Sequence, residues 1–109
     1  MAKADNLQGS LDLLVLKILS RRAPMHGYAI MMAVEAIAGD VLRVEEGSLY
    51  PALHRLEHQG WIKARWAESE TGRQAKFYAL TTAGRSQLEK ETANWNRLST
   101  AINLVVGEA

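Results

Sequence analysis

The stretch from Gly47 to Gly60, GSLYPALHRLEHQG, constrains the fold of this chain more than any other. Pro51 lacks an N–H group and its ring clashes with a preceding helical turn, so we expect it in the first turn of a helix. The helix should therefore begin at about Ser48, with Gly47 or Ser48 as its cap. Gly60 should end it, because glycine readily adopts a positive φ.

The two sides of this predicted helix differ in character. At about 100° per residue, one side is an apolar stripe made of Leu49, Ala52, Leu53 and Leu56. The other side is rich in hydrogen-bonding groups and holds no large aliphatic residue; it consists of Tyr50, Pro51, His54, Arg55 and His58. A helix of this size fits the major groove of DNA, where side chains such as Arg read base edges. An ordinary amphipathic helix with a solvated face has the same pattern, so features elsewhere in the chain are needed to distinguish the two interpretations.

Length and composition exclude several classes of protein. The chain has 109 residues, enough for one domain with a modest core, and it has no cysteine for disulfides or thiolate metal sites. The polar N-terminus does not resemble a signal peptide, and the longest apolar run is too short to span a bilayer. We therefore expect a cytoplasmic protein without a membrane partner. The chain has thirteen Lys and Arg and twelve Asp and Glu, so its net charge is close to zero. If it binds DNA, its cations must therefore be placed locally, and its affinity should depend on two subunits that contact one duplex.

Two helices are predicted before the central one. The first is LDLLVLKILSRR, with Ser10 as a candidate cap. Its helical period gives an apolar stripe that faces the core, and Leu13 and Leu16 lie on roughly the opposite side of the helix. A helix that is apolar on two sides usually has two neighbours, so either a later helix of this chain or a second subunit covers Leu13 and Leu16. A second helix should run over residues 26–38, with a buried stripe that includes Ile37, and a short strand over residues 41–44.

A hairpin is predicted after Gly60. Residues 61–67 and 75–80 have the composition of strands, and the polar loop between them contains Gly72. The predicted hairpin has more positive than negative charges, and its cations are Lys63, Arg65, Arg73 and Lys76. Arg73 lies near the tip, where it is placed to reach a phosphate or a minor groove. Trp61 and Trp66 are expected to be structural.

The last helix is predicted from a cap at Thr81-Thr82 onward. It carries Leu88, Trp95 and Ile102 at intervals of seven, with Leu98 and Val105 at alternate positions of the same stripe. That spacing is typical of a coiled-coil seam. A helix of about 24 residues spans roughly 36 Å, more than a small core needs, so we expect it to pack on a second copy of the chain. The order of elements predicts a mainly α fold with a small β-hairpin: a winged helix-turn-helix over residues 1–80 and a dimerisation helix over residues 81–109.

The residues also resemble a known family. LQGSLDLLVLKIL, HGYAI, GSLYPALHRLEHQG, FYALTTAG and the trailing helix are similar to the PadR family of bacterial transcriptional regulators, in its compact form with a single C-terminal helix. The resemblance implies a homodimeric repressor that binds a pseudo-palindromic operator in double-stranded DNA through residues 48–59, with residues 61–80 as the wing. Its motif positions are Gly47, Ser48, Tyr50 and Pro51. Tyr28 is the aromatic of the second helix and either contacts the DNA backbone or packs.

The resemblance and the residues also bear on an effector and on two other functional classes. Some relatives respond to small aromatic compounds, and two copies of Trp95 near the dimer axis would sandwich such a ligand; alternatively, Trp95 is only a seam residue. We expect no enzyme, no cofactor and no metal, because no carboxylate joins His54 and His58 on their helix face and no glycine-rich phosphate loop is present. The alternative function is a winged-helix protein-interaction module without specific DNA binding.

Overall fold

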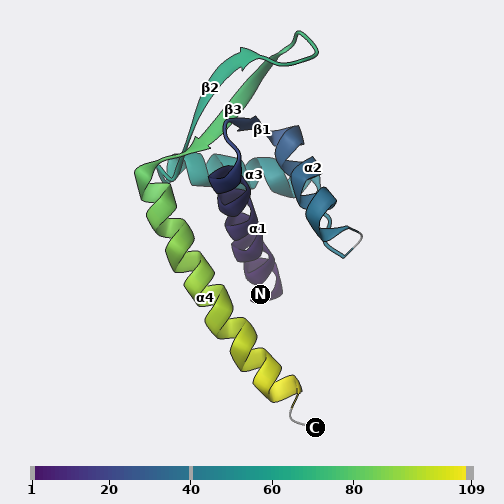
Figure 1. Cartoon of the computed structure of the whole chain (residues 1–109), viewed down its shortest axis with the longest axis vertical. Coiled ribbons are helices and arrows are strands. Elements are labelled where there is room, and N and C mark those ends of the chain that lie inside the picture. The colour runs from purple at the N-terminus through teal and green to yellow at the C-terminus, as the bar shows by residue number, and fades with distance from the viewer. Residues whose placement is uncertain (1, 40, 108–109) are drawn as a thin grey trace.

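The computed structural model describes residues 2–39 and 41–107, with side chains from Ser10 onward. Its elements are α1 (Ala2–Arg21), β1 (Met25–His26), α2 (Gly27–Ala38), α3 (Glu46–His58), β2 (Ile62–Glu68), β3 (Gln74–Leu80) and α4 (Thr82–Val106). Helix α3 crosses the middle of the molecule, the β2–β3 hairpin projects on one side, and α1 and α4 extend on the other (Figure 1). The predicted fold class, a winged helix-turn-helix with a long C-terminal helix, is confirmed.

The core forms around α3, which contacts α1, α2 and β2. The apolar stripe predicted for this helix is fully buried; its four residues are at most 1% exposed, namely Leu49, Ala52, Leu53 and Leu56. They pack with Val15, Leu19 and Ile30 from the two preceding helices and with Ile62 at the base of the hairpin. Burial of this stripe fixes which side of α3 is left for other contacts.

The start of α3 differs from the prediction. The helix begins at Glu46, with Glu45 as its N-cap, so Pro51 lies in the second turn. The missing N–H of Pro51 leaves the carbonyl of Gly47 without its usual helical donor. Gly47 is exposed, so water can hydrate that carbonyl, which is why the proline is tolerated. The end of the helix is as predicted, since Gly60 has a φ of 80°.

The N-terminal helix and the first strand also differ from the predictions. Helix α1 runs from Ala2 to Arg21, so Ser10 lies inside it; a serine costs little within a helix that tertiary packing stabilises. Residues 41–44 form no strand. The additional strand is β1, which pairs with β3 through Met25–Tyr78 and His26–Phe77 and gives an antiparallel sheet of order β1-β3-β2. A strand needs a free edge to pair with, and β1 uses the one that β3 offers.

Helix α2 has the predicted extent but a shorter buried stripe. It spans Gly27–Ala38 and ends at Gly39, which has a φ of 62° and donates its N–H to the Glu35 carbonyl. Ile30 and Val34 are buried as expected, whereas Ile37 is 66% exposed. The last turn of α2 therefore extends past the core.

A tight junction joins the hairpin to α4. The Thr81 hydroxyl oxygen accepts a hydrogen bond from the Gly84 N–H at 3.0 Å, which confirms the predicted cap, and donates one to the Gly60 carbonyl at 2.7 Å. A Cβ atom added to Gly84 would lie 1.9 Å from the Trp61 carbonyl oxygen. Only glycine allows this approach, so the TTAG sequence fixes where α4 leaves the domain.

Two residues predicted for the dimer interface lie against the core of their own chain. Leu16 is fully buried and Leu88 packs against the core, because α4 lies along α1 in the same chain. Leu13 is half-buried. The other predicted seam residues are about half exposed or more: Trp95 47%, Leu98 52%, Ile102 47% and Val105 76%. Helix α4 thus covers its own domain with its first turns, and its second half extends beyond the rest of the domain (Figure 1). The seam side chains of this second half are exposed.

We expect Gly84→Ala to lower the free energy of unfolding by roughly 1–3 kcal/mol, because the new methyl group forces the Trp61 carbonyl away. Urea unfolding followed by circular dichroism measures the change. Gly47→Ala is the matched control, since nothing lies within 4 Å of its added Cβ; in a helix it should raise stability by about 0.5 kcal/mol or more. Equal stability of Gly84→Ala and the parent would show that the junction between the hairpin and α4 does not require a glycine.

Candidate nucleic-acid interface

The side of α3 that lies opposite the buried stripe is open to solvent. Pro51, His54 and His58 fall in this outer sector and all three are exposed. Ser48, near the start of the helix, is exposed as well. The sector carries imidazole and hydroxyl groups and no large aliphatic side chain, as the sequence predicted, so it offers hydrogen-bonding groups to a partner.

Tyr50 lies on one flank of α3 and packs against the start of α2. A Cβ atom added to Gly27 would come within 2.8 Å of Tyr50 Cε1, so the ring lies directly over the glycine. Tyr50 keeps 45% of its surface exposed, and the neighbouring Tyr28 keeps 56%. The HGY and GSLY sequences therefore meet at the junction of α2 and α3, where Tyr50 packs on Gly27.

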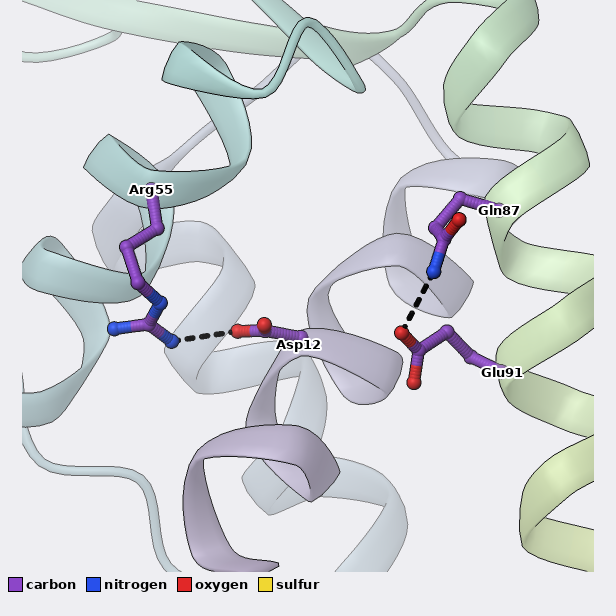
Figure 2. A network of polar contacts seen from close by, with 4 residues as sticks. All are labelled: Asp12, Arg55, Gln87 and Glu91. Atoms are coloured by element: carbon purple, nitrogen blue, oxygen red, sulfur yellow. Dashed lines mark hydrogen bonds and ion pairs between the residues drawn. The ribbon is translucent and has the colours of Figure 1, made fainter. Parts of the chain in front are cut away.

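Arg55 lies on the other flank and is not the free donor that the sequence suggested. Its Nη2 atom donates to Asp12 Oδ1 of α1 at 2.7 Å (Figure 2). The Arg55 side chain is 38% exposed and the Asp12 side chain 18%. Helical angle places Arg55 near the polar side of α3, but α1 packs on that flank and its Asp12 binds the guanidinium.

Asp12 lies between α3 and α4. On the α4 side, Gln87 Nε2 donates to Glu91 Oε2 at 2.9 Å, and both side chains face α1 (Figure 2). Burial raises the pKa of the Asp12 carboxyl above its ordinary value of 3.8. The Arg55 guanidinium opposes this shift, and the negative charge of Glu91 adds to it. The ion pair thus compensates only part of the desolvation of Asp12.

The wing is attached to α3 by a second ion pair. Lys76 Nζ donates to Glu57 Oε1 at 3.0 Å and lies 5.9 Å from the centre of the Tyr78 ring. The hydrogen bond to Glu57 raises the pKa of Lys76, and burial raises the pKa of the Tyr78 phenol. Lys76 was predicted to be a free cation for DNA, whereas the structure uses it to position the wing.

The four predicted wing cations do not share one surface. In the β2–β3 register, Lys63 lies opposite Ala79 and Arg65 opposite Phe77, so both are on the face away from Lys76 and α3. Both are exposed. Arg73 is exposed in the loop between β2 and β3. Of the four, only Arg73 is an exposed cation on the side where α2, α3 and the wing meet.

A hollow of about 1330 Å³ opens between α2, α3 and the wing. Four of the predicted contact residues line it: Tyr28, Tyr50, Arg73 and Lys76. Sequence reasoning missed two other lining residues. His26 caps α2 by accepting a hydrogen bond from the Ala29 N–H at 3.2 Å, and only its position before a helix start signalled this. Trp66 was expected to be structural, yet it is 65% exposed.

Residues 15–90 match the transcriptional regulator PadR-like family. The chain belongs to this family. The transcriptional regulator YqjI of Escherichia coli is 38% identical over 82 residues, which cover 75% of this chain and 37% of that protein. A transcriptional regulator structure from Clostridium thermocellum has a TM-score of 0.81 at 26% identity and covers 91% of this chain and 95% of that one. A PadR-like regulator structure from Bacillus cereus has a TM-score of 0.75 at 30% identity, with 92% and 94% covered.

As a PadR-like protein, this chain is a DNA-binding transcription regulator. The family and fold are those of regulators, which are not enzymes. None of the helices within residues 2–39 and 41–107 combines the length and the apolar character needed to cross a membrane. Among the same residues, no three His, Cys, Asp or Glu side chains gather into a metal site.

We expect Asp12→Asn to change how stability depends on pH. Because the folded-state pKa of Asp12 lies above its ordinary value of 3.8, the folded protein binds this proton more tightly than the unfolded chain. The contribution of Asp12 is therefore most favourable below pH 3.8 and falls as pH rises through the folded-state pKa. Urea unfolding at a series of pH values should show the variant gaining on the parent across this window. A difference that stays constant with pH would contradict the assignment.

Proposed function

We propose that this chain is a homodimeric repressor that places α3 of each subunit in the major groove of a pseudo-palindromic operator. The observation that carries the proposal is the outer sector of α3, where exposed His54 and His58 stand on a helix anchored to the core by its opposite side. Half-sites should then lie about 34–36 Å apart, or a multiple of that distance. Occupancy of the operator would block polymerase.

The proposed contacts divide by position. His54 and His58 face base edges, since they lie furthest from the core stripe, with Pro51 between α3 and the groove wall. Ser48 and the hydroxyl groups of Tyr28 and Tyr50 are suited to phosphates, which position a protein without reading sequence. Arg73 at the tip of the wing reaches the adjacent minor groove. Arg55 and Lys76 act indirectly, because their ion pairs fix the orientation of α3 and of the wing.

A second copy of the chain is the proposed partner of α4. Four seam side chains remain open on its second half, and they are Trp95, Leu98, Ile102 and Val105. Burying each contributes on the order of 1.5–3 kcal/mol before the entropy of association is subtracted. We propose residues 1–80 as the DNA-binding part and residues 81–109 as the dimerisation part. An aromatic effector stacked on Trp95 would then act at the subunit interface and release the operator.

We expect His54→Ala to weaken operator binding by at least about fivefold, because a side chain that reads a base edge contributes roughly 1–3 kcal/mol. The probe is a duplex that the parent protein selects from a random pool, and fluorescence anisotropy measures the affinity. Thermal unfolding should be unchanged, since His54 is exposed.

Lys90→Ala is the control for this measurement, because Lys90 is exposed on α4 and outside the proposed interface. It should bind like the parent. If His54→Ala also binds like the parent, α3 does not read the sequence through this residue. If selection enriches no sequence and the parent binds all duplexes equally, the chain is not a sequence-specific regulator, and the protein-interaction alternative gains support.

We expect Leu98→Asp to convert the dimer into monomers, because a carboxylate placed in an apolar seam cannot be desolvated without a partner. Sedimentation equilibrium measures the mass. Thr100→Asp is the matched control, since Thr100 is exposed on the same helix but lies away from the seam. A Leu98→Asp protein that remains dimeric at the parent's concentration range would show that the subunits associate elsewhere.

A further inference from the structure

Trp66 is an exposed aromatic residue on the side of the wing that faces α3. In the strand register it lies opposite Lys76, so the two side chains share a face of the hairpin. Lys76 reaches across to Glu57 of α3, which identifies this face as the inner one. Trp66 lines the hollow between the wing, α2 and α3, together with Tyr28 and Tyr50.

The fold itself does not use Trp66. The next pair toward the body, Ala64 with Tyr78, is covered, and Tyr78 is only 6% exposed. Trp66 lies on the same face one pair further from the body, and it is not among the residues that pack in or against the core. The indole therefore remains 65% exposed, although burying a side chain of this size is strongly favourable.

The charges around Trp66 are poorly suited to hold a DNA strand alone. Glu68 and Glu70 of the wing line the same hollow as Arg73 and Lys76, and Lys76 is already paired with Glu57. The inner face of the wing thus has little net positive charge with which to attract phosphates. An uncharged contact is what this surface offers, and Trp66 is its largest exposed apolar group.

We propose that Trp66 packs against the deoxyribose carbons of the DNA strand that runs between the major groove occupied by α3 and the minor groove reached by Arg73. This inference rests on the proposed function. Apolar side chains at the minor groove are an established means of gripping a duplex. Sugar carbons are the apolar part of the backbone that a flat indole meets between two phosphates. The contact neutralises no phosphate, so it releases no counterion and has its own signature in the salt dependence of binding.

The test compares Trp66→Ala and Arg73→Ala with the parent on the duplex selected by the parent from a random pool, with affinity measured across salt concentrations. Trp66→Ala should lose at least about tenfold in affinity, as is common for a tryptophan at an interface, with an unchanged slope of log affinity against log salt. Arg73→Ala should instead reduce that slope by about one. Trp66→Phe should recover part of the loss, because it keeps an apolar ring.

A spectroscopic measurement reports on the indole itself. The emission of Trp66, taken as the difference between the parent and Trp66→Phe, should move to shorter wavelength when the duplex is added, because contact with sugar carbons excludes water from the ring. Thermal unfolding of Trp66→Ala and Trp66→Phe should match that of the parent, since Trp66 lies outside the core.

Each contrary result overturns the inference. Unchanged affinity of Trp66→Ala on a duplex that the parent binds removes Trp66 from the interface and leaves the proposed function standing. A loss accompanied by a smaller salt slope shows that the variant acts through a displaced cation. An emission spectrum that the duplex does not change rules out the contact. A parent that binds no duplex overturns the proposed function and the role of Trp66 together.

Discussion

Burial of one apolar stripe on α3 is the interaction on which the rest of the structure depends. Leu49, Leu53 and Leu56 lie at the centre of the core, and α1, α2 and β2 all pack around this helix. Because these neighbours enclose only part of the cylinder, the outer sector with His54 stays free. The same packing that stabilises the domain therefore leaves the outer sector of α3, the proposed DNA-reading surface, exposed on a helix whose opposite side is fixed in the core.

The two flanks of α3 turn this packing into a defined orientation. On one flank, Arg55 is paired with Asp12 of α1; on the other, Glu57 is paired with Lys76 of the wing. Partly exposed ion pairs contribute little stability, but each joins α3 to an element distant in sequence. Since the burial of Asp12 opposes its ionisation, the Asp12–Arg55 pair is better understood as a device for positioning than as a source of stability. Helix α1 also contacts α4, so the proposed reading helix and the proposed dimer helix are linked through it.

The boundaries of the elements show how local signals compete with tertiary contacts. Pro51 suggested a helix start at Ser48, yet α3 begins at Glu46, because an exposed carbonyl at Gly47 tolerates the missing donor. Residues 41–44, which are β-branched at both ends, suggested a strand, but they form none, and the third strand of the sheet is β1, which pairs with β3. In the first case exposure to solvent offsets a local preference, and in the second a long-range partner decides which segment becomes a strand.

The sequence by itself determined the buried stripe of α3, the cap at Thr81, the turn at Gly60, the hairpin and the family, because each follows from periodicity, from a local backbone preference or from a contiguous motif. Tertiary structure alone decided which polar residues of α3 are free. Helical angle put Tyr50, His54 and Arg55 on one broad side, but it contains no information about which neighbours pack on the two edges of that side. The Asp12–Arg55 pair joins residues 43 positions apart, and the seating of Tyr50 on Gly27 joins two separate helices. Such contacts depend on how the helices dock, and docking is set by the whole core at once.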